Sequence, residues 1–248
     1  MAEAPQELET LRSRLDELRG RIERSAQRAG RASDEIKLIA VSKTHPASVL
    51  REALEAGATD FGENRVQEAE EKIAELKGAP ARWHLIGPLQ ANKARRAVKL
   101  FDCIHSIDSV ELIKRLERLC VEEEREDLPV LVQINLAEEE TKSGARIEEV
   151  PGIIEKINGC KRLKLTGLMT LPPFYEDAER VRPFFRRLRE LRDELATQEV
   201  FKSGAGELSM GMSHDFEIAI AEGATMVRVG TAIFGERPVR ETIVFSKE

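Results

Sequence analysis

Apolar residues along the chain fall into two kinds of segment that alternate with each other. Short apolar runs predict strands, and longer runs with an apolar residue every three or four positions predict amphipathic helices. The predicted strands are Lys37–Val41, Asp60–Phe61, Arg82–Ile86, Cys103–His105, Val130–Asn135, Leu163–Leu168, Glu207–Ser209 and Met226–Val229. The predicted helices are Ala47–Ala56, Arg65–Leu76, Ala91–Leu100, Val110–Glu124, Ile147–Ile157, Ala178–Thr197 and Phe216–Ala221. This alternation indicates an α/β protein with a parallel sheet.

Before the first predicted strand, apolar residues form a single stripe at helical spacing. Its members are Leu8, Leu11, Leu15, Leu18 and Ile22. The stripe predicts an amphipathic helix, and Gly30 is expected to end it. The segment is short for a coiled coil, so its apolar face is expected to pack on the rest of the protein. We therefore expect an N-terminal helix within residues 1–30 and one domain over residues 31–248.

Eight strands separated by helices fit two architectures. One is an open doubly wound sheet, and the other is a closed (β/α)8, or TIM, barrel. The number of strands and the length of 248 residues favour the barrel. Functional residues of such barrels lie at the C-terminal ends of the strands. The residues just after each predicted strand are therefore where we expect the chemistry.

Composition and charge argue against several classes of protein. The net charge of -6 is unlike that of proteins that bind nucleic acid or anionic lipid. The longest stretch without a charged side chain runs from Leu165 to Tyr175, which is too short to cross a membrane. The N-terminal residues lack the features of a secretory signal. Three widely spaced cysteines do not form a disulfide framework, so a reducing cytoplasm is expected.

Lys43 follows the first predicted strand and is the first candidate for chemistry. A lysine desolvated at the mouth of a barrel has a lowered pKa, so its neutral amine becomes available for imine formation. Lysines also end strands simply because solvent is there. Position alone therefore leaves both interpretations open.

The segments after the seventh and eighth predicted strands are the other candidates. The first opens a helix, whose N–H groups attract anions, although Ser213 could instead only cap that helix. Arg228 lies in a strand that should be buried, so it needs a partner, which could be a structural ion pair. Gly230 would let a ligand approach the backbone. Because such barrels often bind phosphate after these two strands, a phosphorylated aldehyde would join this site to Lys43.

Several motifs resemble those of the pyridoxal phosphate homeostasis protein family. They occur in order between about Lys37 and Gly235. The motifs are VSKT (41–44), FGENRVQE (61–68), HLIGPLQANK (84–93), TKSG (141–144), GLMT (167–170), LSMGMS (208–213) and RVGTAIFG (228–235). The resemblance implies a single-domain barrel similar to the N-terminal domain of alanine racemase, with an extra N-terminal helix. It also implies pyridoxal 5′-phosphate (PLP) as the cofactor.

The resemblance implies a set of cofactor-binding residues. They are Lys43, Asn64, Ser209, Ser213, Arg228, Gly230 and Thr231. Lys43 would carry PLP as a Schiff base, and Arg228 would face the pyridine nitrogen. Ser213 would hold the phosphate with the backbone of Gly230 and Thr231, and Ser209 would assist. Asn64 would line the pocket, and Lys142 is expected to be exposed, with a secondary cofactor contact as the alternative.

The family has no well-established turnover and is associated with PLP supply, vitamin B6 and amino-acid balance. The resemblance therefore implies a cytoplasmic PLP carrier, expected to be a monomer, whose further partners would be apo PLP enzymes. An arginine beside the pyridine nitrogen disfavours its protonation and makes the ring a poorer electron sink. The alternatives are an amino-acid racemase or decarboxylase and a cofactor-free imine aldolase. The racemase's second base, a tyrosine from an extra domain, has no candidate besides Tyr175. The spacing of the four histidines does not indicate a metal site.

Overall fold

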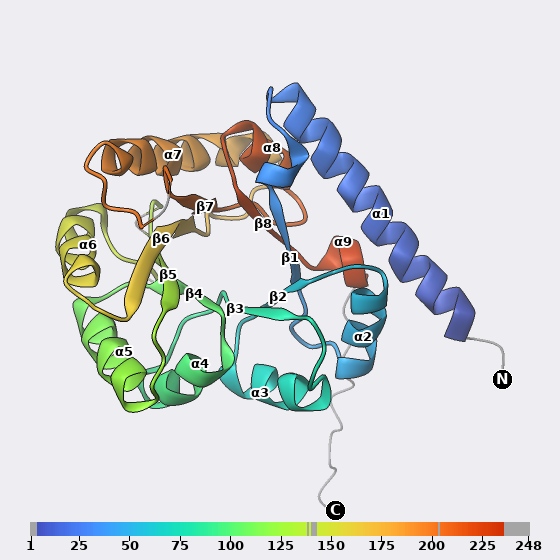
Figure 1. Ribbon diagram of the computed structural model, residues 1–248. Coiled ribbons are helices and arrows are strands. Elements are labelled where there is room, and N and C mark those ends of the chain that lie inside the picture. The colour runs from blue at the N-terminus through green and yellow to red at the C-terminus, as the bar shows by residue number, and fades with distance from the viewer. Residues whose placement is uncertain (1–3, 138, 140–142, 203, 236–248) are drawn as a thin grey trace, which may run out of the picture.

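In the computed structural model, residues 4–137, 139, 143–202 and 204–235 are described, and their strands close into a parallel barrel in chain order (Figure 1). The strands are β1 (Lys37–Val41), β2 (Asp60–Glu63), β3 (Arg82–Leu85), β4 (Cys103–Ile107), β5 (Leu128–Ile134), β6 (Leu163–Thr170), β7 (Glu207–Ser209) and β8 (Met226–Val229). Because β8 pairs with β1, with Ile39 opposite Arg228, the barrel is confirmed and the open sheet is wrong.

Helices surround the barrel and cover the outward-facing side chains of the strands (Figure 1). They are α1 (Ala4–Arg28), α2 (Ala47–Glu55), α3 (Val66–Glu75), α4 (Ala94–Leu100), α5 (Val110–Glu122), α6 (Val150–Asn158), α7 (Arg182–Ala196), α8 (Phe216–Ala221) and α9 (Thr231–Phe234). None of the helices within the described ranges is long and apolar enough to cross a membrane. The short α9 was not predicted from the sequence.

Alternation along the strands separates the barrel interior from the helix-facing core. Ile39 packs in a small cluster with residues of four other strands, which can meet only inside the barrel. Its neighbour Ala40 belongs to the larger core between strands and helices. In β8, Val227 and Val229 belong to that larger core, so Arg228 between them points to the interior. In both layers, each fully buried aliphatic side chain stabilises the folded protein by about 1.5–3 kcal/mol.

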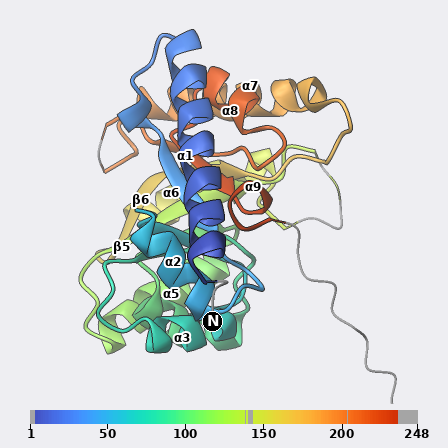
Figure 2. The ribbon, with the colours of Figure 1, turned by 90° about the vertical axis from the view of Figure 1, so that its right-hand side faces the viewer.

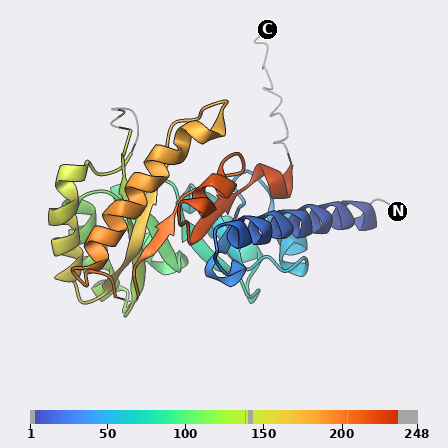
Figure 3. The same cartoon turned by 90° about the horizontal axis from the view of Figure 1, so that it is seen from above.

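The N-terminal helix α1 packs along the outside of the barrel against α2, α8 and α9 (Figures 2 and 3). Its buried apolar residues are Leu11, Leu15, Leu18, Ile22 and Ala26. Arg21 reinforces this contact, because its guanidinium lies 4.7 Å from the Phe216 ring centre and its Nε lies 3.1 Å from Glu217 Oε1. Gly30 ends the helix region with a φ of 69°, as the sequence predicted. α1 therefore bridges the first and last units of the barrel.

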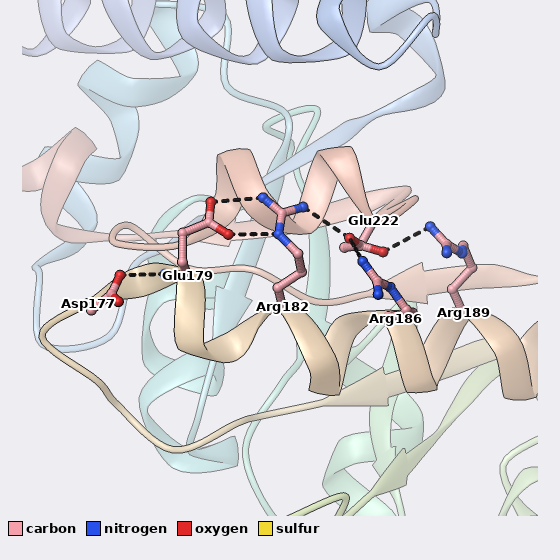
Figure 4. A network of polar contacts seen from close by, with 6 residues as sticks. All are labelled: Asp177, Glu179, Arg182, Arg186, Arg189 and Glu222. Carbon is pink, nitrogen blue, oxygen red and sulfur yellow. Dashed lines mark hydrogen bonds and ion pairs between the residues drawn. The ribbon is translucent and has the colours of Figure 1, made fainter.

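Glu222, directly after α8, joins that helix to α7 (Figure 4). Its carboxylate accepts hydrogen bonds from Arg182 Nη1 at 3.0 Å and Arg186 Nη2 at 3.3 Å, and Arg189 Nη1 lies 3.0 Å away. Burial raises the pKa of Glu222, but the hydrogen bonds from Arg182 and Arg186 outweigh it and lower the pKa below its usual value. One buried carboxylate thus holds three guanidinium groups of a neighbouring helix.

The helices after β4 and β2 begin in different ways. Ser109 caps α5, and its Oγ accepts the Leu112 N–H at 3.4 Å. α3 begins at Val66 without a side-chain cap. Asn64 therefore lies in the loop between β2 and α3, at the mouth of the barrel.

Candidate functional site

Lys43 lies at the C-terminal mouth of the barrel, two residues beyond the end of β1, and its side chain is half-buried. The neighbouring strand β8 ends beside it, because Ala40 pairs with Val229. Gly230 follows β8 at this edge, and a Cβ there would lie 3.1 Å from the Val41 carbonyl oxygen. Glycine therefore allows the ends of the two strands to approach closely. The backbone of Gly230 and the Lys43 turn consequently share one side of the mouth.

The turn that carries Lys43 has a strained backbone. Thr44 adopts a φ of 72°, which is a rare conformation for a β-branched residue. Its backbone N–H donates a hydrogen bond to the Glu68 carboxylate of α3. On the other side of the lysine, the His45 N–H donates to the Ser42 carbonyl oxygen at 3.1 Å. Such strain persists only where the surroundings fix the backbone, and it often marks a functional site.

A buried ion pair fixes this turn from below. Glu63 at the end of β2 is fully buried, and its Oε1 accepts hydrogen bonds from Ser42 Oγ and Lys72 Nζ, both at 2.6 Å. Lys72 Nζ also donates to the Ser42 carbonyl oxygen and to Glu68 Oε1, both at 2.7 Å. Burial raises the pKa of Glu63, and the hydrogen bond and charge of Lys72 reduce this increase. The residues on both sides of Lys43 are thus held by charged groups.

The loop between β7 and α8 supplies polar groups on the opposite side of β8 from Lys43. Ser213 is half-buried, and its Oγ accepts a hydrogen bond from the Gly230 N–H at 3.3 Å. Asp215 Oδ1 accepts the Met212 N–H at 2.6 Å and so closes the loop. Gly211 has a φ of 92°, and a Cβ there would collide with α8. Thr231, the next residue after Gly230, is exposed at the same mouth.

Arg228 lies deeper in the barrel and is only 2 % exposed. Its Nη1 donates to Ser209 Oγ at 2.6 Å, and its Nη2 donates to the Thr170 carbonyl oxygen at 2.9 Å. Burial lowers the pKa of Arg228 to about 10, and the charge of Asp215 opposes this decrease. Within the described ranges, no carboxylate lies at ion-pair distance from this guanidinium. The structural ion pair considered from the sequence is therefore absent from this part of the chain.

The structure groups the seven predicted residues at two depths. The residues at the mouth are Lys43, Asn64, Ser213, Gly230 and Thr231, and the deeper residues are Ser209 and Arg228. Asn64 also lines a groove of about 990 Å³ beside the mouth, together with Thr44 and the adjacent face of α3. Lys142 lies outside the described residues.

Sequence reasoning missed the charged groups behind the mouth. Glu68 and Lys72 are four residues apart on α3, which is the spacing of an ion pair on one helix face. That spacing is visible in the sequence. The contact of Lys72 with Glu63 is not, because only the packing of α3 on β2 brings the two together.

Three potential metal ligands meet inside the barrel. One ligand atom of each of His84, Cys103 and His105 lies within 4.8 Å of the others. However, His84 Nδ1 and His105 Nε2 are 3.0 Å apart, which is a hydrogen-bond distance. Burial raises the pKa of the Cys103 thiol to about 12, so it stays protonated. The two imidazoles are therefore arranged as a hydrogen-bonded pair.

Known proteins resemble this chain in sequence over most of its length. Residues 13–238 match the family "Alanine racemase, N-terminal domain". The pyridoxal phosphate homeostasis protein of Aquifex aeolicus is 44% identical over 224 residues, which are 90% of this chain and 97% of that protein. Its Pseudomonas aeruginosa counterpart is 42% identical over 93% of this chain and 97% of that protein.

Solved structures are similar over the same region. PipY of Synechococcus elongatus, solved with PLP bound, has 40% sequence identity and a TM-score of 0.79 over 91% of this chain and 100% of its own. Alanine racemase of Corynebacterium glutamicum, at 21% identity and a TM-score of 0.61 over 92% of this chain and 63% of its own, shows the shared fold alone. The chain therefore belongs to the pyridoxal phosphate homeostasis protein family and has the fold of the alanine racemase N-terminal domain.

Proposed function

We propose that this protein binds PLP at the C-terminal mouth of its barrel and takes part in maintaining the cellular supply of PLP. The observation that carries the proposal is the placement of the half-buried Lys43 beside the Ser213–Gly230 pair, with the buried guanidinium of Arg228 below them. The related PipY, which covers nearly the whole chain, has been solved with PLP bound. The strained turn at Thr44 gives independent support, since such strain is typical of functional sites.

The residues present suit the chemistry of PLP. Bound PLP supplies an aldehyde carbon, a pyridine ring and a phosphate. The Lys43 amine would form the C=N link to that carbon with loss of one water. Ser213 Oγ and the backbone of Gly230 and Thr231 would hold the phosphate, and Arg228 would face the ring nitrogen. Asn64 would line the pocket, and assistance to the phosphate by Ser209 stays a prediction.

We further infer that the protein carries PLP rather than using it for turnover. Arg228 is a cation at the bottom of the site, so it disfavours a second positive charge on the ring nitrogen. A ring without that proton withdraws electrons less well from a bound amino acid. Turnover of a free amino acid that is lost in Lys43→Ala would contradict this inference and favour a racemase-type enzyme.

The test of cofactor binding is to reduce the PLP-loaded protein with borohydride and to locate the adduct by peptide mass spectrometry. Wild-type protein should be yellow, bleach with hydroxylamine and carry the adduct on Lys43. Lys43→Ala should carry none, and without PLP it should unfold at the temperature of the unloaded wild type, because the side chain lies outside the packed layers. Lys37→Ala is the matched control, since Lys37 begins the same strand at the other end and should not affect the adduct. An adduct on another lysine, or none, would contradict the proposal.

The remaining expectations belong to the same proposal. We propose a cytoplasmic monomer in which residues 1–30 form a helix packed on one barrel domain of residues 31–248, and which passes PLP to apo enzymes. The three cysteines are unpaired, as in proteins of a reducing compartment. Mixing loaded protein with an apo PLP enzyme, with and without a trap for free PLP, tests the transfer. Activation that the trap abolishes would show release into solution instead.

A further inference from the structure

A continuous chain of buried polar side chains crosses the barrel interior behind the candidate site. It begins at Arg228, whose Nη1 lies 2.6 Å from Ser209 Oγ, and Ser209 Oγ lies 2.9 Å from His105 Nδ1. His105 Nε2 lies 3.0 Å from His84 Nδ1, and His84 Nε2 lies 3.0 Å from Asp60 Oδ1. All five residues are at most 3% exposed. The chain joins five different strands, so the barrel itself sets its geometry.

A single direction of hydrogen bonding connects the two ends of this chain when His105 carries its proton on Nε2. Arg228 can only donate, and the ionised Asp60 can only accept. Ser209 therefore accepts from Arg228 and donates its proton to His105 Nδ1. His105 then donates from Nε2 to His84 Nδ1, and His84 donates from Nε2 to Asp60. This order requires His105 to be neutral and to carry its proton on Nε2.

The charges around the chain agree with that order. Burial, together with the positive charges of Arg228 and Lys37, lowers the pKa of His105 well below its usual range, which keeps this imidazole neutral. Burial raises the pKa of Asp60, but hydrogen bonds from His84, Arg82 and Thr59 outweigh it and lower the pKa to about 2. The chain therefore ends on a fixed negative charge.

That negative charge lies at the opposite end of the barrel from the candidate site. Asp60 begins β2, and with Arg82 and Lys37 it lines a cavity of about 290 Å³. Arg82 Nη2 lies 2.8 Å from Asp60 Oδ2 and holds the carboxylate in place. Hydrogen bonds that share one direction polarise each other. Ser209 Oγ, which donates toward this carboxylate, is therefore a stronger acceptor for the guanidinium of Arg228.

We propose that Asp60, His84 and His105 are positioning residues that hold Arg228, through Ser209, in the orientation that faces the ring of PLP. This inference rests on the proposed function and explains a buried cation that has no carboxylate beside it in the described part of the chain. It also gives Ser209 a role that does not depend on phosphate: its hydroxyl connects the guanidinium to the imidazoles.

The first test needs no cofactor. Nitrogen-15 NMR of the unloaded protein at pH 7, with the four histidines assigned by single substitutions, should show His105 neutral with its proton on Nε2. The Arg228 Nη signals should show restricted rotation in the wild type and faster rotation in Asp60→Asn. A charged His105, a proton on its Nδ1, or unchanged Arg228 signals would overturn the proposal.

The second test measures how substitutions far from the cofactor site affect the binding and the absorption of PLP. Asp60→Asn and His105→Gln should each weaken PLP binding between about threefold and tenfold and shift the absorption maximum of bound PLP. Cys103→Ala, in the same strand as His105 but outside the chain of hydrogen bonds, should change neither. Wild-type affinity and spectrum in both folded variants would overturn the proposal.

The two tests separate the possible failures. If Asp60→Asn does not fold, as judged by circular dichroism, His105→Gln and the NMR of the wild-type histidines still decide the matter. If wild-type protein binds no PLP, the proposed function is wrong, whereas the Arg228 and histidine signals still show whether the chain holds the guanidinium.

Discussion

The lysine that carries the proposed chemistry depends for its position on a second lysine. Lys72 is 5% exposed and hydrogen bonds to Glu63, Glu68 and the Ser42 carbonyl oxygen. Its ammonium group contacts both carboxylates in a buried environment. Removing it would leave Glu63 buried without a cation, which is costly because desolvation is no longer offset.

We therefore predict that Lys72→Met lowers the free energy of unfolding at pH 7 by about 3 kcal/mol, as measured by urea denaturation. The double variant Glu63→Gln/Lys72→Met should recover part of this loss, because no buried charge then remains unpaired. Lys99→Met is the control: Lys99 is exposed and pairs with Glu123 on the surface, so its loss should cost less than about 1 kcal/mol. Equal losses in Lys72→Met and Lys99→Met would contradict the prediction.

The sequence showed the candidate residues at the mouth but not their supports. Lys43 and Arg228 stand out because each breaks an apolar run. His84 and His105 looked like ordinary structural histidines, since nothing in a linear sequence shows that the third residues of β3 and β4 face each other. The closed barrel creates that contact. Contacts of this kind depend on how neighbouring strands are aligned, and the sequence pattern does not show that alignment.

At the scale of elements, one buried carboxylate at the end of α8 joins this helix to α7. Glu222 is 5% exposed and is surrounded by three arginines of α7, which are partly exposed. Hydrogen bonds to a charged group contribute more than neutral ones, and here several converge on one acceptor.

We predict that Glu222→Ala lowers the free energy of unfolding by about 2 kcal/mol and increases hydrogen exchange in α7 and α8. Arg186 and Arg189 would then lose the carboxylate between them, whereas Arg182 would keep its contact with Glu179. The matched control is Glu190→Ala, because Glu190 is exposed on α7 and only approaches Arg187 at 3.8 Å. If both variants lose the same stability, the contact with Glu222 does not hold the helices together.

Strand bounds show where pattern reading works and where it fails. β1, β7 and β8 have the bounds predicted from the sequence. β2 and β4 extend further than predicted, because Glu63 and Ser106 interrupt the apolar pattern although both are buried. Glu63 is buried with the help of Ser42 and Lys72, which the strand pattern does not show. Hydropathy alone therefore ends such strands too early.

For the whole molecule, the buried His105 makes stability depend on pH. The unfolded chain protonates this residue with an ordinary pKa of about 6.5, whereas burial lowers the pKa in the folded protein well below that. Below pH 6.5 the unfolded state therefore binds more protons, and the free energy of unfolding falls as pH falls.

We predict that this one residue contributes a loss of up to about 1.4 kcal/mol per pH unit below pH 6.5. Asp60, with a folded pKa of about 2, adds a separate loss between about pH 4 and pH 2. Urea denaturation at pH 7, 6 and 5 checks the first effect: His105→Gln should show a shallower pH dependence than the wild type. Glu63 and Asp215, whose pKa values are raised, act in the opposite sense but equally in both proteins. Parallel curves would contradict the prediction.

The bridge formed by α1 has a consequence for synthesis on the ribosome. Arg21 and its partner Glu217 are 196 residues apart in the chain, and the apolar stripe of α1 packs on α8 and α9. α1 therefore leaves the exit tunnel long before the helices that cover its leucines. A nascent chain in this state exposes apolar surface of the kind that chaperones bind. Ribosome-associated chaperones should therefore bind α1 early and release it only when β8 pairs with β1.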